Sequence, residues 1–389
     1  MTAEHGGFLP TPDEMLVLRA CMHEPQKALA AWKKWRGQYA LSHLNVAQKN
    51  LLPLVYHNLH AAGYTEPEDM AFLEDAYQES RNRIQALWHS LGQVLHAFHD
   101  RGISPLLLKG MALGVLCYPD RYTRRMADID VIVPLAQVEQ SIEVMRDAGW
   151  GCDEPLETWS RCNFNACTFR NAQNRMLDMH WHLFSGARDD DDAILWKRAE
   201  SLNTEVGEIR TLSVSDHLFH CCIHGYAWSP LHPMRWIVDA HMLLRHAQGS
   251  IDWQYIIEQA RARQLTLRLL NALKILQGAE VLAVPDSAIH ALRSIPVSRW
   301  EQAEHDFITS PLPSHPTVGQ EKLRLLRMAW FKHRRYRRDS SLLSCMWTYP
   351  AMLSEEMCLG RVWLLPWGFV RVVARMLHGK YARLMARNP

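Results

Sequence analysis

The sequence has 389 residues, with 43 basic and 41 acidic side chains and a formal net charge of +2 at pH 7. A chain of this length can bury a sizeable core in two or three domains or lobes, and its near-neutral charge excludes a general affinity for polyanions. No apolar run reaches the about 18 residues that a membrane-spanning helix needs, and the first residues carry no secretory signal pattern.

The first hundred residues predict a helical lobe. After a loose tail, Thr11 and Pro12 supply a cap and a proline that favour a helix start. Amphipathic helices are predicted at residues 15–21, 26–35, 45–62 and 68–100. The last of these is long, and its apolar stripe predicts packing against a core rather than a ligand site; the stripe consists of Leu87, Leu91, Val94, Leu95 and Phe98.

The next stretch, residues 106–133, contains two strands that flank a helix. Residues 105–108 are an apolar run typical of a buried strand, and a helical pattern follows at 111–118. The second strand, 129–133, is preceded and interrupted by Asp128 and Asp130, whose side chains project side by side because strand residues two apart share a face. Two such carboxylates need a counter-charge, and a divalent cation such as Mg²⁺ or Mn²⁺ suits their oxygen atoms.

Lys109 and Gly110 lie between the first strand and the helix, where free N–H groups favour anions. Arg124 and Arg125 precede the carboxylates and could pair with a phosphate in fork geometry. Taken alone, an Asp-x-Asp pair is equally typical of a solvated polar turn. The combination with a lysine, a glycine and two arginines favours a phosphate-handling site instead.

The segments LLLKGMAL and YPDRYTRRMADIDVIV resemble the signature of the uncharacterised nucleotidyltransferase family, which lies within the DNA polymerase beta-like superfamily. The resemblance extends over roughly residues 10–290. It implies a metal-dependent enzyme that uses a nucleoside triphosphate. Many members of the superfamily have Gly-Ser after the first strand, whereas this chain has Gly110 followed by Met111. The resemblance therefore implies that Lys109, Gly110 and Arg125 bind the phosphates without the help of a serine hydroxyl.

Strands are predicted again at residues 162–170 and 176–183, joined by a polar turn. In the second of them Asp178, His180 and His182 alternate with apolar residues and so share one face. The resembling family has an acid at the position of Asp178, which implies that this residue is the third carboxylate of the site. The alternative is an exposed strand acid. His180 could line the site or could be a half-buried neighbour.

The segment SGARDDDD, residues 185–192, predicts a flexible and solvated acidic loop, followed by a helix at 193–201. A helix at 217–226 carries His217, His220 and His224 on one face, beside two cysteines. This face is either a zinc site or, as we expect, packs under the active site with one histidine, such as His224, reaching it. Farther on, the spacing of Arg235 and Asp239 predicts a structural ion pair, although Arg235 could also reach the substrate.

The chain beyond Glu321 is rich in basic and aromatic residues, and a basic amphipathic helix is predicted at 369–385. Such a segment fits an anionic partner, a membrane surface or a solvated face over a tryptophan-rich core. We expect the last of these, with Arg334 to Arg338 exposed and four tryptophans closing the core. They are Trp330, Trp347, Trp363 and Trp367.

The predicted fold class is α+β, with a small mixed β-sheet of nucleotidyltransferase type embedded between N-terminal and C-terminal helical lobes. Its predicted parts are an N-terminal helical lobe (1–100), a core with the Asp-x-Asp strand (101–190), a helical lobe (191–300) and a basic, tryptophan-rich region (301–389). Nine cysteines without a Cys-x-x-Cys pair predict reduced thiols and a cytoplasmic protein.

The predicted function is transfer of a nucleotidyl group from a nucleoside triphosphate such as ATP to an acceptor hydroxyl. A peptide, a protein, RNA or a small molecule could supply that hydroxyl. The predicted residues are Asp128, Asp130 and Asp178 for catalysis and Mg²⁺ or Mn²⁺ binding, Lys109, Gly110 and Arg125 for the phosphates, and His180, Arg235 and His224 around them. Two alternatives are a nucleotide-sensing or partner-binding module on the same fold and, more remotely, a zinc-bearing helical protein.

Overall fold

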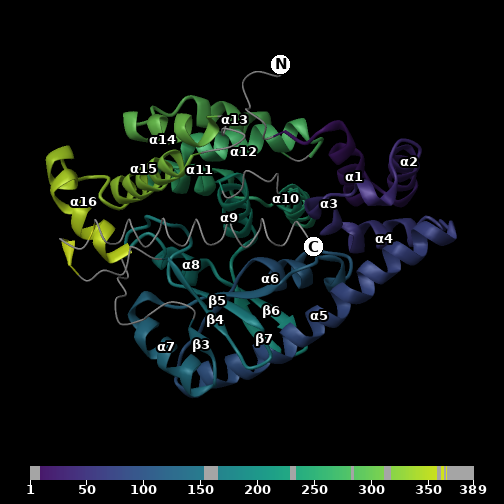
Figure 1. Ribbon diagram of the computed structural model, residues 1–389, viewed down its shortest axis with the longest axis horizontal. Coiled ribbons are helices and arrows are strands. Elements are labelled where there is room, and N and C mark those ends of the chain that lie inside the picture. Colours follow the sequence, from purple (N-terminus) through teal and green to yellow (C-terminus); the bar gives the residue numbers. More distant parts are fainter. Residues whose placement is uncertain are drawn as a thin grey trace.

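The computed structural model describes residues 9–152, 165–227, 234–281, 284–310, 317–356, 361–362 and 365. These residues form an α+β protein in which one mixed sheet is flanked by helices, so the predicted fold class is confirmed. In Figure 1 the sheet lies in the lower half, the N-terminal helices lie at the right, and the later helices lie above the sheet.

The N-terminal lobe is built from short helices and one long one. The elements are α1 (Pro12–Met22), α2 (Pro25–Arg36), η1 (Leu41–His43), α3 (Val46–Lys49), α4 (Leu52–Ala61) and α5 (Pro67–Asp100). The single helix predicted at 45–62 is two helices, because Pro53 lacks the N–H that a continuous helix would use and is instead accommodated in the first turn of α4.

Helix α5 has 34 residues and runs along the lower edge of the molecule in Figure 1. The predicted stripe is confirmed as packing, since Leu87, Leu91, Val94 and Phe98 are all buried in a core shared with the sheet. Helix α5 also holds the loop that follows α6. The Tyr77 hydroxyl donates to Asp120 Oδ2 at 2.5 Å, and the Ser80 hydroxyl donates to the Tyr122 carbonyl at 2.7 Å.

The described strands form a seven-stranded sheet in the order β3-β4-β5-β2-β1-β7-β6. Their bounds are β1 (Leu106–Leu107), β2 (Asp128–Ile132), β3 (Gly151–Cys152), β4 (Ala166–Arg170), β5 (Met176–His180), β6 (Glu200–Thr204) and β7 (Gly207–Thr211). Strands β2 and β5 are parallel neighbours, as are β1 and β7, and the other pairs are antiparallel.

The two faces of the sheet differ in character. On β2 and β5, the apolar residues Ile129, Val131, Leu177 and Met179 face the core that α5 covers. Alternation along a strand sends the residues between them to the opposite face, toward the helical lobe. The acids of both strands therefore share one face, between the sheet and the later helices.

The hairpin of β6 and β7 was not predicted, since a helix was expected to continue to residue 201. Helix α8 (Ala193–Arg198) is shorter, and the chain then enters β6. The signal was present in the alternation of buried Leu202 and Ile209, which pair across the hairpin, and in Gly207, whose φ of +105° suits the turn. Because β7 pairs with β1, the sheet extends beyond residue 190.

The remaining connections in the sheet region are α6 (Lys109–Leu116), η2 (Arg121–Thr123), η3 (Leu135–Gln137) and α7 (Val138–Asp147). The later helices are α9 (Val214–Ala227), α10 (Arg235–Ala247), α11 (Trp253–Ala262), α12 (Thr266–Gly278), α13 (Asp286–Arg293), α14 (Arg299–Thr309), α15 (Val318–Tyr336) and α16 (Leu342–Glu356). Helices α9, α10 and α12 share a large apolar core with the N-terminal helices. No helix among the described residues is long and apolar enough to cross a membrane.

The cysteine prediction needs correction. Cys152 on β3 and Cys167 on β4 form a disulfide, because the two antiparallel strands bring them together on one side of the sheet. The prediction of free thiols applies to the other described cysteines, which are Cys21, Cys117, Cys221, Cys222 and Cys345.

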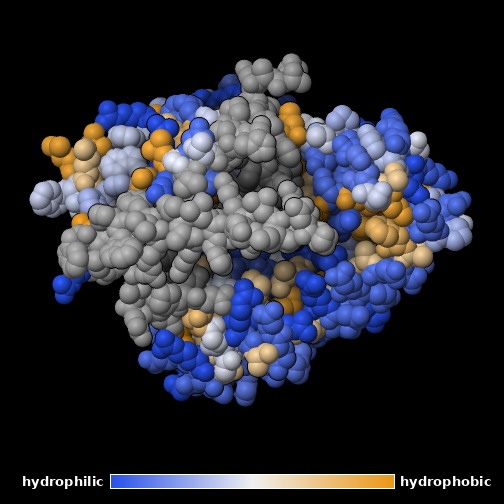
Figure 2. Space-filling view, viewed as in Figure 1, coloured by the Kyte–Doolittle hydropathy of each residue, from blue (hydrophilic) through white to orange (hydrophobic). Residues whose placement is uncertain are grey.

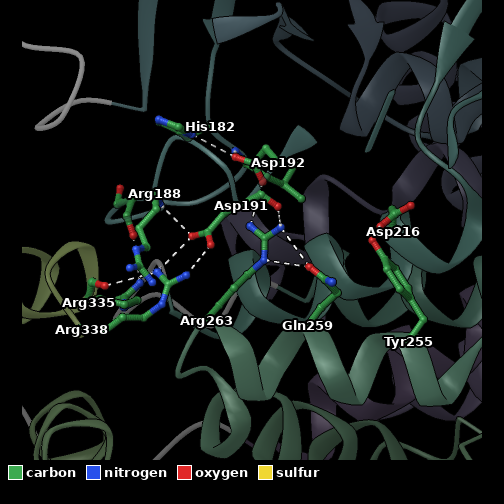
Figure 3. A network of polar contacts seen from close by, with 12 residues as sticks. His182, Arg188, Asp191, Asp192, Asp216, Tyr255, Gln259, Arg263, Arg335 and Arg338 are labelled. Atoms are coloured by element: carbon green, nitrogen blue, oxygen red, sulfur yellow. Dashed lines mark hydrogen bonds and ion pairs between the residues drawn. The ribbon is translucent and has the colours of Figure 1, made fainter. Parts of the chain in front are cut away.

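The acidic segment 185–192 was wrongly predicted to be solvated throughout. Asp189 and Asp190 are exposed, but Asp192 is buried, and its carboxylate accepts from Arg263 at 2.8 Å and contacts His182 Nδ1 at 3.1 Å (Figure 3). Burial alone would raise the pKa of Asp192, but Arg263 and His182 hold it at about 2. The paired charges remove the cost of burial that an isolated acid would carry.

The acidic segment is also linked by ion pairs to the C-terminal helices. Arg338 pairs with Asp191, and Arg335 of α15 pairs with Glu304 of α14 while donating to the Ser185 carbonyl at 3.0 Å (Figure 3 shows both arginines). We name this set the ionic cluster: His182, Asp191, Asp192, Arg263, Glu304, Arg335 and Arg338.

The expected arrangement of the tail is therefore wrong for Arg334, Arg335 and Trp347, whereas Trp330 is half-buried against Trp300 and Tyr349. Arg334 and Arg335 are 8% and 7% exposed, because they meet buried partners, whereas Trp347 on α16 is 87% exposed. Leu343 and Met346 are exposed beside it, and apolar surface is visible over α16 at the left of Figure 2. Trp363, Trp367 and the helix predicted at 369–385 lie outside the described residues.

Candidate active site

Three carboxylates gather on two neighbouring strands. Asp128 and Asp130 lie on β2, and Asp178 lies directly beside Asp130 on β5 in the parallel register. Ligand atoms of Asp130, Asp178 and His180 all lie within 4.8 Å of one another, which makes this a group that could hold a metal ion. Asp178 is oriented by β4, where the Thr168 hydroxyl donates to its Oδ1 at 2.7 Å.

Lys109 reaches across to this cluster. Helix α6 begins at Lys109, two residues before the predicted start, and the residue has a left-handed φ of +45° that non-glycine residues rarely adopt. Its Nζ lies 2.6 Å from Asp130 Oδ1 and 3.5 Å from His180 Nε2. The predicted phosphate-binding lysine is thus bound to a predicted metal ligand.

His180 forms the buried side of the cluster. Its Nε2 lies 3.2 Å from Asp130 Oδ1, and its Nδ1 is buried without a hydrogen-bond partner. Burial and then the positive charge of Lys109 lower the pKa of His180, so the neutral imidazole is favoured and one ring nitrogen keeps a lone pair. Neutral imidazole is a ligand for divalent metals.

The carboxylates are unequally neutralised. Burial alone would raise the pKa of Asp130, but Lys109 and His180 hold it well below its usual range. Burial and the nearby charges of Asp130 and Asp178 raise the pKa of Asp128 from 3.8 to about 6. The cluster therefore has an excess of negative charge, and together with the unpartnered nitrogen of His180 it fits a divalent cation.

A pH dependence of stability follows from Asp128. The pKa of Asp128 is higher in the folded protein than in the unfolded chain, so the folded protein binds the proton more tightly. The ionised carboxylate therefore destabilises the fold. This destabilisation is complete above pH 7 and fades between about pH 6 and 4. Without metal, Asp128→Asn should therefore raise the free energy of unfolding by about 1–3 kcal/mol at pH 7.5 and by much less at pH 4.5. Urea unfolding at both pH values in EDTA measures this difference. An equal effect at both pH values, or one no larger than that of exposed Asp189→Asn, would contradict the assignment.

Gly110 is required by packing as well as by any ligand. A Cβ atom there would lie 2.6 Å from Arg124 Nη1 and 3.1 Å from Met126 Sδ. Arg124 is itself held by Asp239 of α10, to which its Nε and Nη2 donate at 2.8 Å, and the Tyr118 hydroxyl donates to the same carboxylate at 2.6 Å. Arg124 is therefore committed to a structural contact and not placed for phosphate.

The predicted ion pair of Arg235 with Asp239 is accordingly wrong, because the carboxylate of Asp239 pairs with Arg124 instead. Arg235, the first residue of α10, instead donates from Nη1 to the Arg125 carbonyl at 3.0 Å. Burial and then Arg124 lower the pKa of Arg235, while the negative charges of Asp239 and then Asp128 counteract them. Arg125 directs its own side chain to Glu79 of α5, with Nη2 2.6 Å from Oε1.

Two histidines of α9, His220 and His224, lie near enough to the site for the positive charge of Lys109 to lower the pKa of each. Burial and then Lys109 lower the pKa of His224 to about 3, and the rings of His220 and His224 lie 5.3 Å apart. His217 lies elsewhere, with Nε2 2.8 Å from the Thr211 hydroxyl. Among the described residues, the group able to hold a metal is that of Asp130, Asp178 and His180, so the structure gives no support to a zinc face on α9.

The sequence interpretation missed one neighbour of the site, Thr168, and it named His220 on the histidine face of α9 without assigning that residue to the site. Thr168 could have been found, because it alternates onto the face of β4 that lies beside Asp178. His220 approaches the cluster from α9, and its pKa is lowered by burial, then by His224 and Lys109. Only the packing of α9 against the sheet reveals that position.

The chain is similar to one described protein family and, more weakly, to two solved structures. The sequence pattern of a family described as uncharacterised nucleotidyltransferase matches residues 43–278. A lincomycin-bound lincosamide antibiotic adenylyltransferase, LnuA, is 17% identical with a TM-score of 0.28 over 38% of this chain and 91% of its own. An antigenic nucleotidyltransferase-like protein from Paracoccidioides brasiliensis is 15% identical with a TM-score of 0.36 over 52% of this chain and 91% of its own. The curated proteins include no match.

Proposed function

The chain belongs to the uncharacterised nucleotidyltransferase family, and from this premise we propose that it transfers a nucleotidyl group from a nucleoside triphosphate to an acceptor hydroxyl. The observation that carries the proposal is the cluster of Asp128, Asp130 and Asp178 on two neighbouring parallel strands, with more negative charge than the surrounding cations neutralise. Such a cluster is costly unless it binds a cation, and a metal-bound triphosphate supplies one.

In this proposal Asp128, Asp130 and Asp178 would hold Mg²⁺ or Mn²⁺; Asp130 and Asp178 belong with His180 to the group whose ligand atoms lie close enough for an ion, and Asp128 lies on the same strand as Asp130. A bound ion would supply positive charge to the triphosphate oxygens and would lower the pKa of an acceptor hydroxyl. The acceptor oxygen attacks the α-phosphorus, the bond from that phosphorus to the bridging oxygen breaks, and pyrophosphate leaves. Asp178 takes the proton of the acceptor, while Thr168 fixes the orientation of its carboxylate.

In this proposal the phosphates bind at the edge of the site that carries the positively charged side chains. Gly110 offers its backbone near the start of α6, and Lys109, Arg125 and Arg235 supply positive charge. Arg235 is the better placed of the two arginines, since Arg125 is engaged with Glu79. We propose that the acceptor is a peptide, a protein, an RNA or a small molecule with a free hydroxyl.

A nucleotide-sensing module on the same fold is the second candidate. It is favoured by the Lys109 ammonium, which already binds Asp130, and by Met111, which stands where many relatives of the wider superfamily have serine. A sensor would bind the triphosphate without consuming it.

One labelling experiment separates the two. The purified protein is incubated with a cell lysate, Mg²⁺ or Mn²⁺ and each nucleoside triphosphate, labelled at either the α- or the γ-phosphate. A nucleotidyltransferase transfers the α-label to a macromolecule or small molecule and releases the γ-label in pyrophosphate. Transfer of the γ-label would instead indicate a kinase, and saturable binding without any transfer would support the sensor.

Asp178→Ala should separate binding from chemistry. The triphosphate should still bind within about threefold of wild type, because Asp128 and Asp130 remain, while transfer should fall by about two to four orders of magnitude as the proton acceptor is lost. Equilibrium dialysis with labelled nucleotide and the transfer assay measure the two effects, and Asp190→Ala, an exposed acid, is the matched control. If Asp178→Ala loses nucleotide affinity as severely as Asp128→Asn, Asp178 does not act on the acceptor.

A further inference from the structure

Lys109 occupies an unusual place in the candidate active site. Its Nζ lies 2.6 Å from Asp130 Oδ1 and 3.5 Å from His180 Nε2. Asp130 and His180, together with Asp178, are also the residues able to hold a metal ion. Two of the three candidate ligands therefore already share a positive charge that the chain itself supplies.

We propose that the Lys109 ammonium is a tethered cation that holds the place of the divalent metal at Asp130 and His180, and that it must leave this place for the metal to bind. The inference rests on the proposed function, because it concerns the same metal site. It adds that metal binding and the position of Lys109 exclude each other.

The position of Lys109 supports exclusion rather than coexistence, because its Nζ already contacts Oδ1 of Asp130, a candidate metal ligand. Lys109 brings one positive charge to the three acids Asp128, Asp130 and Asp178, so the metal-free cluster keeps an excess of negative charge. A divalent ion on the same Asp130 oxygen would lie within a few ångströms of the ammonium, in a site largely shielded from solvent, where like charges repel strongly.

The side chain of Lys109 has access to solvent, whereas that of Asp130 is buried. The residue lies between β1 and the first turn of α6, and its φ of +45° is fixed by the surrounding structure. Its four-carbon side chain is 19% exposed, compared with 4% for Asp130, so the ammonium can swing toward solvent while Asp130 stays in place. Phosphates bound near the start of α6 would give the displaced ammonium a new partner.

This arrangement links the metal to the nucleotide. In the protein alone, a metal competes with Lys109 for Asp130 and binds weakly. When a triphosphate is present, Lys109 exchanges Asp130 for phosphate oxygens and the metal binds without competition. The free protein is thereby kept from holding a metal ion that lacks its nucleotide.

The test measures Mn²⁺ binding to the nucleotide-free protein by electron paramagnetic resonance of the unbound ion. Lys109→Met should bind Mn²⁺ about tenfold more tightly than wild type or more, because the competing like charge is gone. Lys34→Met, which removes an exposed lysine of α2, should leave the affinity at the wild-type value. Asp130→Asn should abolish tight binding in either background. An Mn²⁺ affinity in Lys109→Met that equals or falls below that of wild type would overturn the inference.

The outcomes also separate this inference from the proposed function. If wild type binds Mn²⁺ in an Asp130-dependent way and Lys109→Met binds no better, only the role of Lys109 fails. If neither protein binds Mn²⁺ at Asp130, the metal site and the inference fail together. If Lys109→Met does not fold, the inference is tested on the wild-type protein instead. Mn²⁺ should then increase the acylation of Lys109 by a small amine-reactive reagent, measured by mass spectrometry. Unchanged or reduced acylation would count against the inference.

Discussion

Asp130→Asn is expected to abolish nucleotidyl transfer and to destabilise the fold, whereas Asp128→Asn should abolish transfer without destabilising it. Each change removes a candidate metal ligand, and we expect transfer to fall by about three orders of magnitude or more. Their effects on stability differ because Asp130 pairs with Lys109 and His180, whereas Asp128 is repelled by the other acids. Losing the partner of a half-buried ammonium should cost about 1–3 kcal/mol.

The α-label transfer assay and urea unfolding in EDTA at pH 7.5 measure the two effects. Asp189→Asn removes an exposed acid and should change neither quantity. Residual transfer near the wild-type rate in Asp130→Asn would exclude this residue as a metal ligand. A loss of stability in Asp128→Asn as large as that in Asp130→Asn would show that the carboxylates do not repel one another as the geometry requires.

Truncation before Glu321 should yield a protein that is insoluble or melts far below the full chain. The deletion removes Arg335 and Arg338, which leaves Glu304 and Asp191 of the ionic cluster without these partners. Breaking one buried pair by removing a single partner costs about 3–5 kcal/mol, which is a large share of the stability of a typical domain. Soluble yield and the melting temperature of the truncated chain measure the effect.

Single substitutions test the cause of that instability. Arg335→Met keeps most of the side-chain volume but leaves Glu304 with only Arg268, so it should lower the melting temperature clearly. Arg293→Met, on the exposed surface of α13, is the matched control and should have little effect. A truncated chain that is soluble and as stable as the full protein would show that the ionic cluster does not stabilise the fold.

Local patterns predicted which side chains share a strand face, and the family resemblance implied that Asp178 joins the Asp-x-Asp pair. Strand alternation placed Asp128 and Asp130 on one face, and the same rule placed Asp178 and His180 together on β5. The long helix α5 and its apolar stripe were also predictable, because helical periodicity depends on residues close in sequence. The sequence carries this information within a few positions.

Pairings between distant residues were not predictable. Asp239 pairs with Arg124 rather than with Arg235 four positions away, because the packing of α10 against the loop before β2 decides which cation is near. The run of acids before α8 looked solvated because its partners, Arg263 and Arg338, lie more than 70 and 140 residues away in sequence. A charge pattern shows how many charged side chains a segment has, but tertiary packing determines which of them are buried.

The contacts of α5 with the loop before β2 determine which segments of this protein could be replaced by those of a relative. Tyr77, Glu79 and Ser80 occupy one turn of the helix and hold Asp120, Arg125 and the Tyr122 carbonyl. The loop that carries Arg124 and Arg125 is therefore not a separate module. A relative's loop could replace this one only together with the matching turn of α5. The loop and that turn must therefore be exchanged together, although they lie some forty residues apart along the chain.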